Sequence, residues 1–486
     1  MTGPDFYTGR LQFTTPRPER IDEKRVTLAH LVSLEGIPWN AHASWADGQL
    51  TVERATKESG ALVCPWLIGA DRWATLVSAS LMEREEPYCL PVELCRGVLH
   101  RLRERSSAWQ AAGYPVSDRS KRLEANALRS FVKAATHQRV AGPCDAAVND
   151  SLQCSFEAMD QLLEDVGPSV GAMRKGMAAR VPPFLGGWGG AIELEKQNAI
   201  NLVRIPLNWG AVATSSTTYD WGATDAAVNA AVAANRKILL GPLIRWTDEE
   251  LPNWLGEQVK TFEDLSTQMS QFVHSVARRY ADRAMVIEVA DRVSRPTPLG
   301  LEPIQQLQLL TDAVRAANNA APSLPRMVTI GLPYGETMVT KATELSPLHF
   351  ADYLLRAEVG LSAIGLEIDC DDNAVGFPQR DPLDVAKLLE RWAALGQPML
   401  AILRLADGPD HDRETDQDAN SKGVPRRSDS RSVTEYVQRI TTVCFANTSV
   451  QGVLWCPEEP NDGSPVLNRG AGVAAAFADW KKWLGI

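Results

Sequence analysis

The sequence predicts an α/β protein in which a (β/α)8 TIM barrel spans residues 181–486, preceded by a small β-sandwich and a helical connector. Short apolar segments alternate with amphipathic helical ones over about the last 300 residues, the pattern of a parallel sheet. The apolar segments number about eight, enough to close a barrel. The first 88 residues instead carry short apolar runs separated by turn residues.

Residues 1–88 are the predicted sandwich. Strands are expected over 26–29, 50–52, 62–67 and 73–77, because pairs such as Asp47-Gly48 and Ser59-Gly60 separate these runs. Sandwiches appended to enzymes often bind carbohydrate, and tryptophan rings can stack on a sugar. The alternative, that these rings belong to a core or a domain interface, is the more usual role of tryptophan. The tryptophans concerned are Trp39, Trp45, Trp66 and Trp73.

Residues 89–180 are the predicted helical connector. Apolar residues recur at helical spacing over 91–109, 123–135 and 152–166, with charged residues between them. Gly113-Tyr-Pro115 and Gly142-Pro143 are expected to break the helices. We expect these helices to pack between the sandwich and the barrel.

The barrel elements follow from the alternation itself. Helices are expected over 223–235, 266–281, 304–317 and 382–395. A barrel places its chemistry at the C-terminal ends of its strands, so residues just after each apolar run are the candidates for function. The expected strands are 184–188, 202–206, 238–244, 286–290, 327–331, 363–368, 399–403 and 450–455.

Composition limits the partners. The chain has a net charge of −10 and no run of about 20 apolar residues, which argues against nucleic acid and membrane partners. The N-terminus lacks a basic segment followed by an apolar one, so a cytoplasmic location is expected. Its eight cysteines form no Cys-x-x-Cys pair, and we expect free thiols, no metal site and no cofactor. The sequence leaves the oligomeric state open.

Several barrel segments form a series along the chain: Tyr219-Asp-Trp221, Gly241-Pro-Leu-Ile-Arg-Trp246, Pro252-Asn-Trp254, Ile287-Glu-Val-Ala-Asp-Arg292, Ile364-Gly-Leu-Glu367 and Gly452-Val-Leu-Trp455. In order and spacing this series resembles the family-10 glycoside hydrolases, the xylanase type. The resemblance covers roughly residues 181 to 486. It implies a barrel that hydrolyses O-glycosidic bonds and a carbohydrate partner, either an oligosaccharide or a polysaccharide.

The sequence departs from that family where its chemistry is performed. The family uses glutamates at the ends of strands four and seven as acid/base and nucleophile, with carboxyls about 5 Å apart. Here Arg292 occupies the first position, and Leu403 or Arg404 the second. Pro242 and Thr247 stand where the family has histidines on strand three. A guanidinium stays protonated and can neither donate that proton usefully nor attack a sugar, so the family mechanism does not transfer.

Other acids near the predicted mouth are candidates for catalysis. Glu367 and Asp369 alternate on one face of strand six, Asp291 ends strand four, and Glu458 follows strand eight. An inverting pair needs carboxyls roughly 6.5 to 9.5 Å apart, a distance that neighbouring strand ends can supply. The alternative is a buried ion network in the lumen that contains Arg292, Arg404, Glu288, Glu367 and Asp369.

Aromatic residues at the predicted strand ends suggest sugar binding. Flat rings stack on the CH faces of sugars, although each ring is also a normal core residue. Arg292 and Arg404 would suit the carboxylate or sulfate of an anionic sugar. The polar insertion 408–432 is expected to be a mobile loop after strand seven. The aromatic candidates are Trp188, Trp209, Trp246, Tyr334 and Trp455.

Two functions therefore remain open. The first is a glycosidase in which an atypical acid pair has replaced the family's glutamates. The second is a catalytically inactive barrel, a pseudoenzyme, that binds a glycan or a partner protein.

Overall fold

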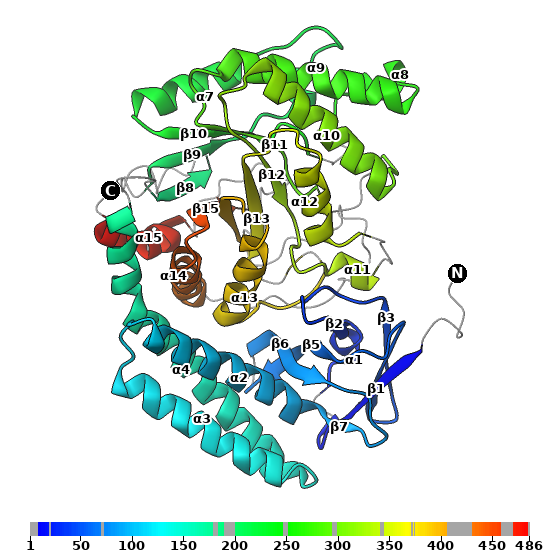
Figure 1. The fold of residues 1–486 in the computed structure, drawn as a ribbon, viewed down its shortest axis with the longest axis vertical. Coiled ribbons are helices and arrows are strands. Elements are labelled where there is room, and N and C mark those ends of the chain that lie inside the picture. Colours follow the sequence, from blue (N-terminus) through cyan, green and yellow to red (C-terminus); the bar gives the residue numbers. More distant parts are fainter. Residues whose placement is uncertain are drawn as a thin grey trace.

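The structure, a computed structural model, consists of two small sheets, a helical segment and a closed barrel (Figure 1). No helix in the part of the chain that it describes is long and apolar enough to cross a membrane. The residues described are 8–18, 21–69, 72–177, 183–188, 200–245, 251–293, 299–340, 345–370, 373, 375–405, 430–457 and 470–484.

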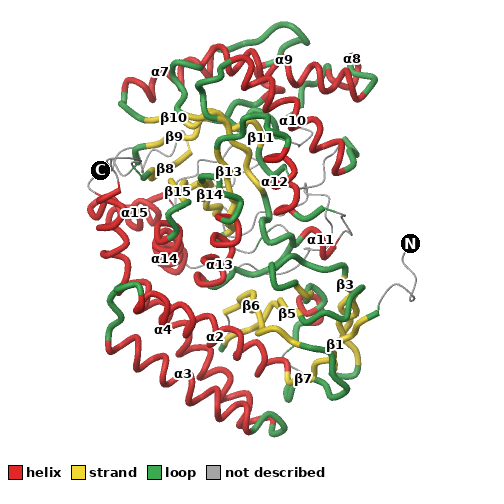
Figure 2. Tube along the Cα trace, in the orientation of Figure 1, coloured by secondary structure: helices red, strands yellow, loops and turns green. Residues whose placement is uncertain are grey.

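Two small sheets form the N-terminal part (Figure 2). One has the strand order β3-β4-β1-β7 and the other β2-β5-β6, and most of their pairs are antiparallel. Alternate residues of β4 are buried, as expected for strands that cover a core on one face. The strands are β1 Gly9–Thr14, β2 His30–Val32, β3 Ala41–Ala46, β4 Gln49–Arg54, β5 Gly60–Ile68, β6 Arg72–Leu81 and β7 Tyr88–Cys89.

One predicted N-terminal strand is wrong. Residues 26–29 were expected to be extended, but a short helix, α1, runs over Glu23–Val26 and the strand begins at His30. The cause is local: the Asp22 side chain accepts hydrogen bonds from the backbone N–H groups of Lys24 and Arg25, which caps a helical turn. Of the four tryptophans, Trp66 is buried in the core, and Trp39 and Trp45 are partly buried and pack against that core.

Three helices follow: α2 Leu90–Ala111, α3 Asp118–Thr136 and α4 Ala141–Met177. Gly142-Pro143 was expected to break a helix but lies in the first turn of α4, where proline is tolerated because its missing N–H would have no partner. Helix α4 reaches the barrel: Arg174 donates to the carbonyls of Phe445 and Val450 at 2.8 and 2.7 Å. Gly171 allows α4 to approach Trp483 near the C-terminus closely, since a Cβ at this position would lie 2.5 Å from Cβ of Trp483.

Eight parallel strands close into a barrel in the order β10-β11-β12-β13-β14-β15-β8-β9, which confirms the predicted fold class. Strand β10 ends at Leu240, earlier than predicted. Gly241 has a φ of 129°, and Pro242 lacks an N–H for the ladder. The strands are β8 Phe184–Trp188, β9 Leu202–Ile205, β10 Lys237–Leu240, β11 Val286–Ala290, β12 Arg326–Ile330, β13 Ala363–Asp369, β14 Met399–Leu405 and β15 Val450–Pro457.

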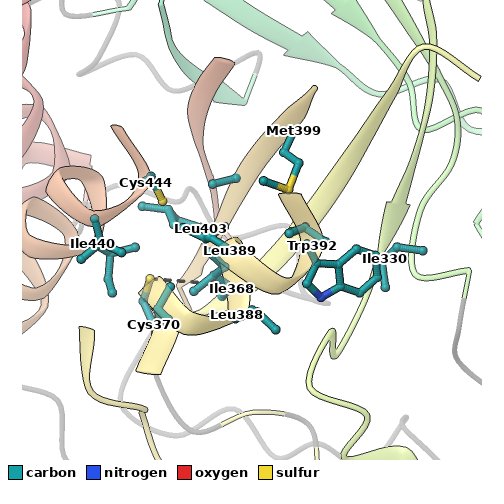
Figure 3. Packing of buried hydrophobic residues seen from close by; sticks show 14 of the residues in the cluster. Ile330, Ile368, Cys370, Leu388, Leu389, Trp392, Met399, Leu403, Ile440 and Cys444 are labelled. Atoms are coloured by element: carbon teal, nitrogen blue, oxygen red, sulfur yellow. Dashed lines mark hydrogen bonds between the residues drawn. The ribbon is translucent and has the colours of Figure 1, made fainter. Parts of the chain in front are cut away.

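Helices lie between and after these strands in the sequence, and the longer ones pack on the outside of the barrel. They are α6 Trp209–Val212, α7 Gly222–Ala233, α8 Leu255–Gln258, α9 Phe262–Tyr280, α10 Pro303–Ala320, α11 Thr337–Thr340, α12 Pro347–Arg356, α13 Pro382–Ala393, α14 Ser430–Ala446 and α15 Gly470–Leu484. Figure 3 shows the packing around β13 and β14, where outward-facing Ile368 and Leu403 lie in one cluster with Leu389 of α13 and Ile440 of α14. The insertion 408–432 lies outside the described residues up to 429, and its last three residues belong to α14.

Candidate functional site

The barrel lumen is apolar at its N-terminal end and ionic at its C-terminal end. The apolar part is one cluster that contains Leu202, Leu239, Val286, Met327, Leu400, Ile402, Leu454 and Cys456. Because side chains alternate along a strand, Arg204, Glu288, Glu367 and Arg404 point into the same lumen as the members of this cluster on their own strands. The charged side chains therefore form the layer beneath the barrel mouth.

Arg204 and Glu288 form the deepest ion pair of this layer. Arg204 donates from Nε to Glu288 Oε2 and from Nη2 to Glu288 Oε1, both at 2.7 Å, a two-pronged geometry that is among the strongest of protein hydrogen bonds. Thr329 also donates from its hydroxyl to Glu288. Burial raises the pKa of Glu288, and the charge of Arg204 opposes that rise. Arg204 remains a cation, since Glu288 offsets the burial of its guanidinium.

Asp291 lies between two arginines at the end of β11. Arg245 donates from Nε and Nη2 to its carboxylate at 3.2 Å, and Arg204 donates from Nη2 at 3.3 Å. Burial would raise the pKa of Asp291, but Arg245, Arg204 and Arg292 outweigh it, so the pKa is lowered. Asp291 is therefore a carboxylate at neutral pH and a poor proton donor.

Glu367 joins two arginines, one from the end of β11 and one from β14. Arg292 Nε donates to Glu367 Oε1 at 3.3 Å, and Nη1 of Arg404 pairs with the same oxygen. Arg292 has a φ of 51°, the left-handed region that non-glycine residues rarely adopt. This turn takes Arg292 out of the strand geometry that would have placed it beside Glu288.

The structure brings most of the predicted charged residues together. Asp291, Arg292, Glu367 and Arg404 all lie in the ionic layer, and Asp369 ends β13, paired in register with Arg404. Of the residues in the predicted ion network, Arg292, Glu367 and Arg404 are joined to one another, whereas Glu288 pairs with Arg204. Glu458 and Trp246 lie outside the described residues. No group of three or more histidine, cysteine, aspartate or glutamate side chains within the described ranges could hold a metal ion.

The predicted aromatic residues do not form one ring. Trp188 points into the lumen, where the guanidinium carbons of Arg204 and Arg245 lie 5.2 and 5.9 Å from its ring centre. Trp209 is buried against Trp254 and Phe272, outside the lumen.

The two remaining aromatic candidates also lie away from the ionic layer. Trp455 is buried in the cluster between strands and helices, since its neighbour Leu454 is the residue that faces the lumen. Tyr334 lies beneath Arg380, whose guanidinium carbon is 3.7 Å from the ring centre. Of the four described aromatic candidates, Trp188 is therefore the one placed among the arginines of the ionic layer.

Two members of the network were missed at the level of sequence. Arg204 interrupts the apolar strand Leu202-Val-Arg-Ile205, and a charge at an inward position of a buried strand is a detectable signal. Arg245 lies in the segment Gly241–Trp246. The predicted resemblance of this segment to the family concerns Pro242, at a histidine position, and not the arginine. In neither case does the sequence identify the carboxylate that serves as the partner.

The geometry restricts what this site can do chemically. Asp291 and Glu367 are buried, and each contacts two guanidinium groups. A carboxylate held in this way is a weak nucleophile, because bond formation would remove the charge that its partners stabilise. The arrangement suits recognition better than proton transfer.

Comparison with known proteins agrees with the predicted resemblance. The family model described as glycosyl hydrolase family 10 matches residues 201–318. Xylanase 10B from Thermotoga maritima is 14% identical, with a TM-score of 0.43 over 58% of this chain and 85% of that one. GH10 from Paenibacillus barcinonensis is 14% identical, with a TM-score of 0.45 over 63% of this chain and 97% of that one. No curated protein matches the sequence.

Proposed function

We propose that this glycoside-hydrolase-like barrel, which resembles family 10 and matches its model over residues 201–318, binds an acidic carbohydrate and does not hydrolyse it by the two-glutamate mechanism. The observation that carries the proposal is the pairing of Arg292 and Arg404 with Glu367. If the resemblance places Arg292 and Arg404 at the two glutamate positions, two cations with one shared carboxylate stand where that mechanism requires an acid and a nucleophile.

The exposure of the network supports an anionic ligand. The side chains of Arg292, Arg245 and Arg404 are 20%, 15% and 14% exposed, whereas those of Glu367 and Asp291 are each 3% exposed. The three arginines are therefore more exposed than Glu367 and Asp291, although Asp369 at the end of β13 is a partly exposed carboxylate. Guanidinium groups bind carboxylate and sulfate groups with two parallel hydrogen bonds, and the ring of Trp188 lies beside them.

The test is calorimetric titration with a galacturonic acid oligomer and a neutral xylo-oligosaccharide of the same length. The acidic oligomer is expected to bind, more weakly as salt rises, while the neutral one binds at least tenfold more weakly. Arg292→Gln and Arg404→Gln are expected to weaken acidic binding, and Arg356→Gln, on the exposed face of α12, serves as the control. Equal affinity for both oligomers contradicts an anionic ligand.

A second candidate function, hydrolysis by an atypical acid pair, has one observation in its favour. The pKa of Glu288 is raised and that of Asp291 is lowered, and such a separation is found in acid/base pairs. The test is a hydrolysis screen on aryl glycosides and polysaccharides. Turnover that disappears in Asp291→Asn or Glu367→Gln supports this candidate, whereas binding without turnover supports the first.

A further inference from the structure

Helices α3 and α4 lie side by side in opposite directions. Ser120 Oγ of α3 donates to Asp165 Oδ2 of α4 at 2.8 Å, and Ser151 Oγ of α4 donates to Ala127 O of α3 at 2.8 Å. Residue numbers rise along α3 while they fall along α4, so the pair is antiparallel. The two hydrogen bonds also show which residues of the two helices are level with each other. Figure 1 shows α3 on the outside of the molecule, with α2 and α4 between it and the barrel.

Beyond its first residue, Asp118, the exposed side of α3 is basic. In the described part of the chain, none of its exposed cations forms an ion pair. The acid in the first half of the helix, Glu124, pairs with Arg103 of α2 at 3.5 Å and so lies on another side. The exposed cations of α3 are Arg119, Lys121, Arg122, Arg129 and Lys133.

The exposed side of α4 carries acids at regular spacing. Asp150, Glu157 and Glu164 are all exposed and follow one another at intervals of seven residues, close to two helical turns, so they lie along one line. None of the three forms an ion pair with another described residue. The two helices therefore present a basic surface and an acidic surface beside each other.

The basic surface lies on the face of the helix pair that α2 does not cover. Around α3, Ser120 and Ala127 face α4, and Glu124 faces α2 on one side of them. Because successive residues are turned by about 100° in a helix, Arg119 and Lys133 fall on the other side of Ser120 and Ala127.

The acids of α4 lie on this same face. Ser151 and Asp165 face α3, and on one side of them Cys144 contacts Cys89, the residue that precedes α2. The same helical geometry places the three acids on the other side of Ser151 and Asp165. The surface away from α2, here called the outer face, therefore contains Arg119, Arg122, Arg129, Lys133, Asp150, Glu157 and Glu164.

Opposite charges are matched along the outer face. Counted from the two hydrogen bonds at about 1.5 Å per residue, Arg119 is level with Glu164 and Lys133 with Asp150, to within about one turn. The axes of packed helices lie about 8 to 10 Å apart, and these side chains point outward, which explains why the pairs do not close within one molecule.

A second copy of this chain is the partner that the pattern fits. A two-fold axis that lies on the outer face and runs parallel to the helices places α4 of one copy on α3 of the other and keeps every level unchanged. Each basic residue then meets an acid. A two-fold axis perpendicular to the helices in the same face would place α3 on α3 and bring like charges together, so charge selects the parallel axis.

We propose that two copies associate through their outer faces about this parallel axis, independently of what the barrel binds. The association is weak and depends on salt, because exposed ion pairs are individually weak and each subunit carries a net charge of −10. Each pair occurs twice by symmetry. The pairs are Arg119 with Glu164 of the partner subunit, Lys133 with Asp150 of the partner subunit, and Arg122 and Arg129 with Glu157 of the partner subunit.

Sedimentation equilibrium on the intact protein measures the association. At about 50 mM salt the mass is expected to rise towards that of a dimer as the protein is concentrated to about 100 µM, and at about 500 mM salt the dissociation constant is expected to increase at least tenfold. A protein that stays monomeric at low salt overturns the proposal, and so does a dimer that salt does not weaken.

Charge reversal tests which surfaces meet. The basic-reversed variant carries Arg122→Glu with Lys133→Glu, and the acid-reversed variant carries Asp150→Lys with Glu157→Lys. Each is expected to weaken association at least tenfold, because like charges then face each other. A one-to-one mixture of the two variants is expected to restore the dimer, since every reversed residue then meets an opposite charge. A mixture that stays monomeric overturns the proposed arrangement.

Two comparisons separate this contact from a general effect of net charge. The acid-reversed variant reduces the net negative charge, so a general effect would strengthen its association, and that outcome overturns the proposal. The control variant carries Lys260→Glu with Arg278→Glu, two exposed cations away from the outer face, and changes the net charge as much as the basic-reversed variant does. Its association is expected to match that of the wild type within about twofold. A control that is weakened as much as the basic-reversed variant contradicts a contact through the outer face.

Discussion

Arg292 Nε lies 3.3 Å from Oε1 of Glu367, so the end of β11 is joined across β12 to β13. Arg404 pairs with the same carboxylate. Glu367 is buried and is the shared counter-charge of two guanidinium groups. Removal of Glu367 would leave Arg292 and Arg404 without their shared counter-charge. This part of the ionic layer is therefore expected to depend on Glu367.

Glu367→Gln is expected to destabilise the protein by about 3 to 5 kcal/mol, the usual cost of removing one partner of a buried ion pair. Urea unfolding measures the change. Asp352→Asn is the control, because its pair with Arg356 is exposed and is expected to contribute less than about 1 kcal/mol. If the two variants lose similar stability, Glu367 does not hold the layer together.

Arg204 and Glu288 are expected to behave as one unit. Arg204→Met leaves a buried carboxylate and Glu288→Leu a buried guanidinium, so each should cost about 3 to 5 kcal/mol. The double variant should lose clearly less than the sum of the two, since neither charge is then left alone. A double-mutant cycle in urea measures this coupling, and strictly additive losses would show that the two-pronged pair contributes no coupling.

Trp188 and Trp209 should respond differently to truncation. Trp209→Ala removes a buried ring that packs on Trp254 and stacks on Phe272, and should cost about 3 to 5 kcal/mol. Trp188→Ala should cost less stability but weaken binding of the galacturonic acid oligomer, because its ring lies beside Arg245. Normal binding by Trp188→Ala would exclude that ring from the ligand site.

His30 makes the stability depend on pH. Burial lowers its pKa from 6.5 to about 3, against a hydrogen bond to Leu28 O and with a contribution from Arg380. Between these values the unfolded chain binds a proton that the folded protein does not, so stability falls as pH falls from 6.5 towards 3. The slope is at most about 1.4 kcal/mol per pH unit.

The matched variant for this prediction is His30→Asn, whose amide retains a donor near Leu28 O but does not titrate. Asp160 has a pKa raised to about 6, so its contribution falls as pH rises, opposite in sign to that of His30. The difference between wild type and His30→Asn cancels the Asp160 contribution. An unchanged difference from pH 7 to pH 4 would contradict the prediction.

The barrel strands were predictable because a strand that is buried on both faces has an almost continuous apolar sequence. Val286–Ala290 is apolar apart from one glutamate and forms a strand over those residues. The failure at 26–29 has a different origin: the caps that Asp22 provides outweigh the strand preference of a short apolar run. Local hydrogen bonds of this kind decide short elements, whereas hydrophobic burial decides long ones.

The ion network was predictable in kind but not in its pairs. Glu288 and Arg292 share a face of an ideal strand, which made them expected neighbours. The left-handed φ of Arg292 turns that side chain to Glu367 instead, and Arg204 from another strand takes its place. Partner choice across strands depends on register and on single backbone angles, and neither is contained in the spacing of charges along the chain.

The contacts of Arg174 bear on where a stable barrel domain begins. This side chain of α4 binds the carbonyls of Phe445 and Val450, at the junction of α14 and β15. A shortened protein that starts just before β8 would leave those carbonyls without their cation and the face of Trp483 uncovered. A protein that reuses this barrel therefore needs helix α4 as well, because α4 holds the junction of α14 and the last strand, β15.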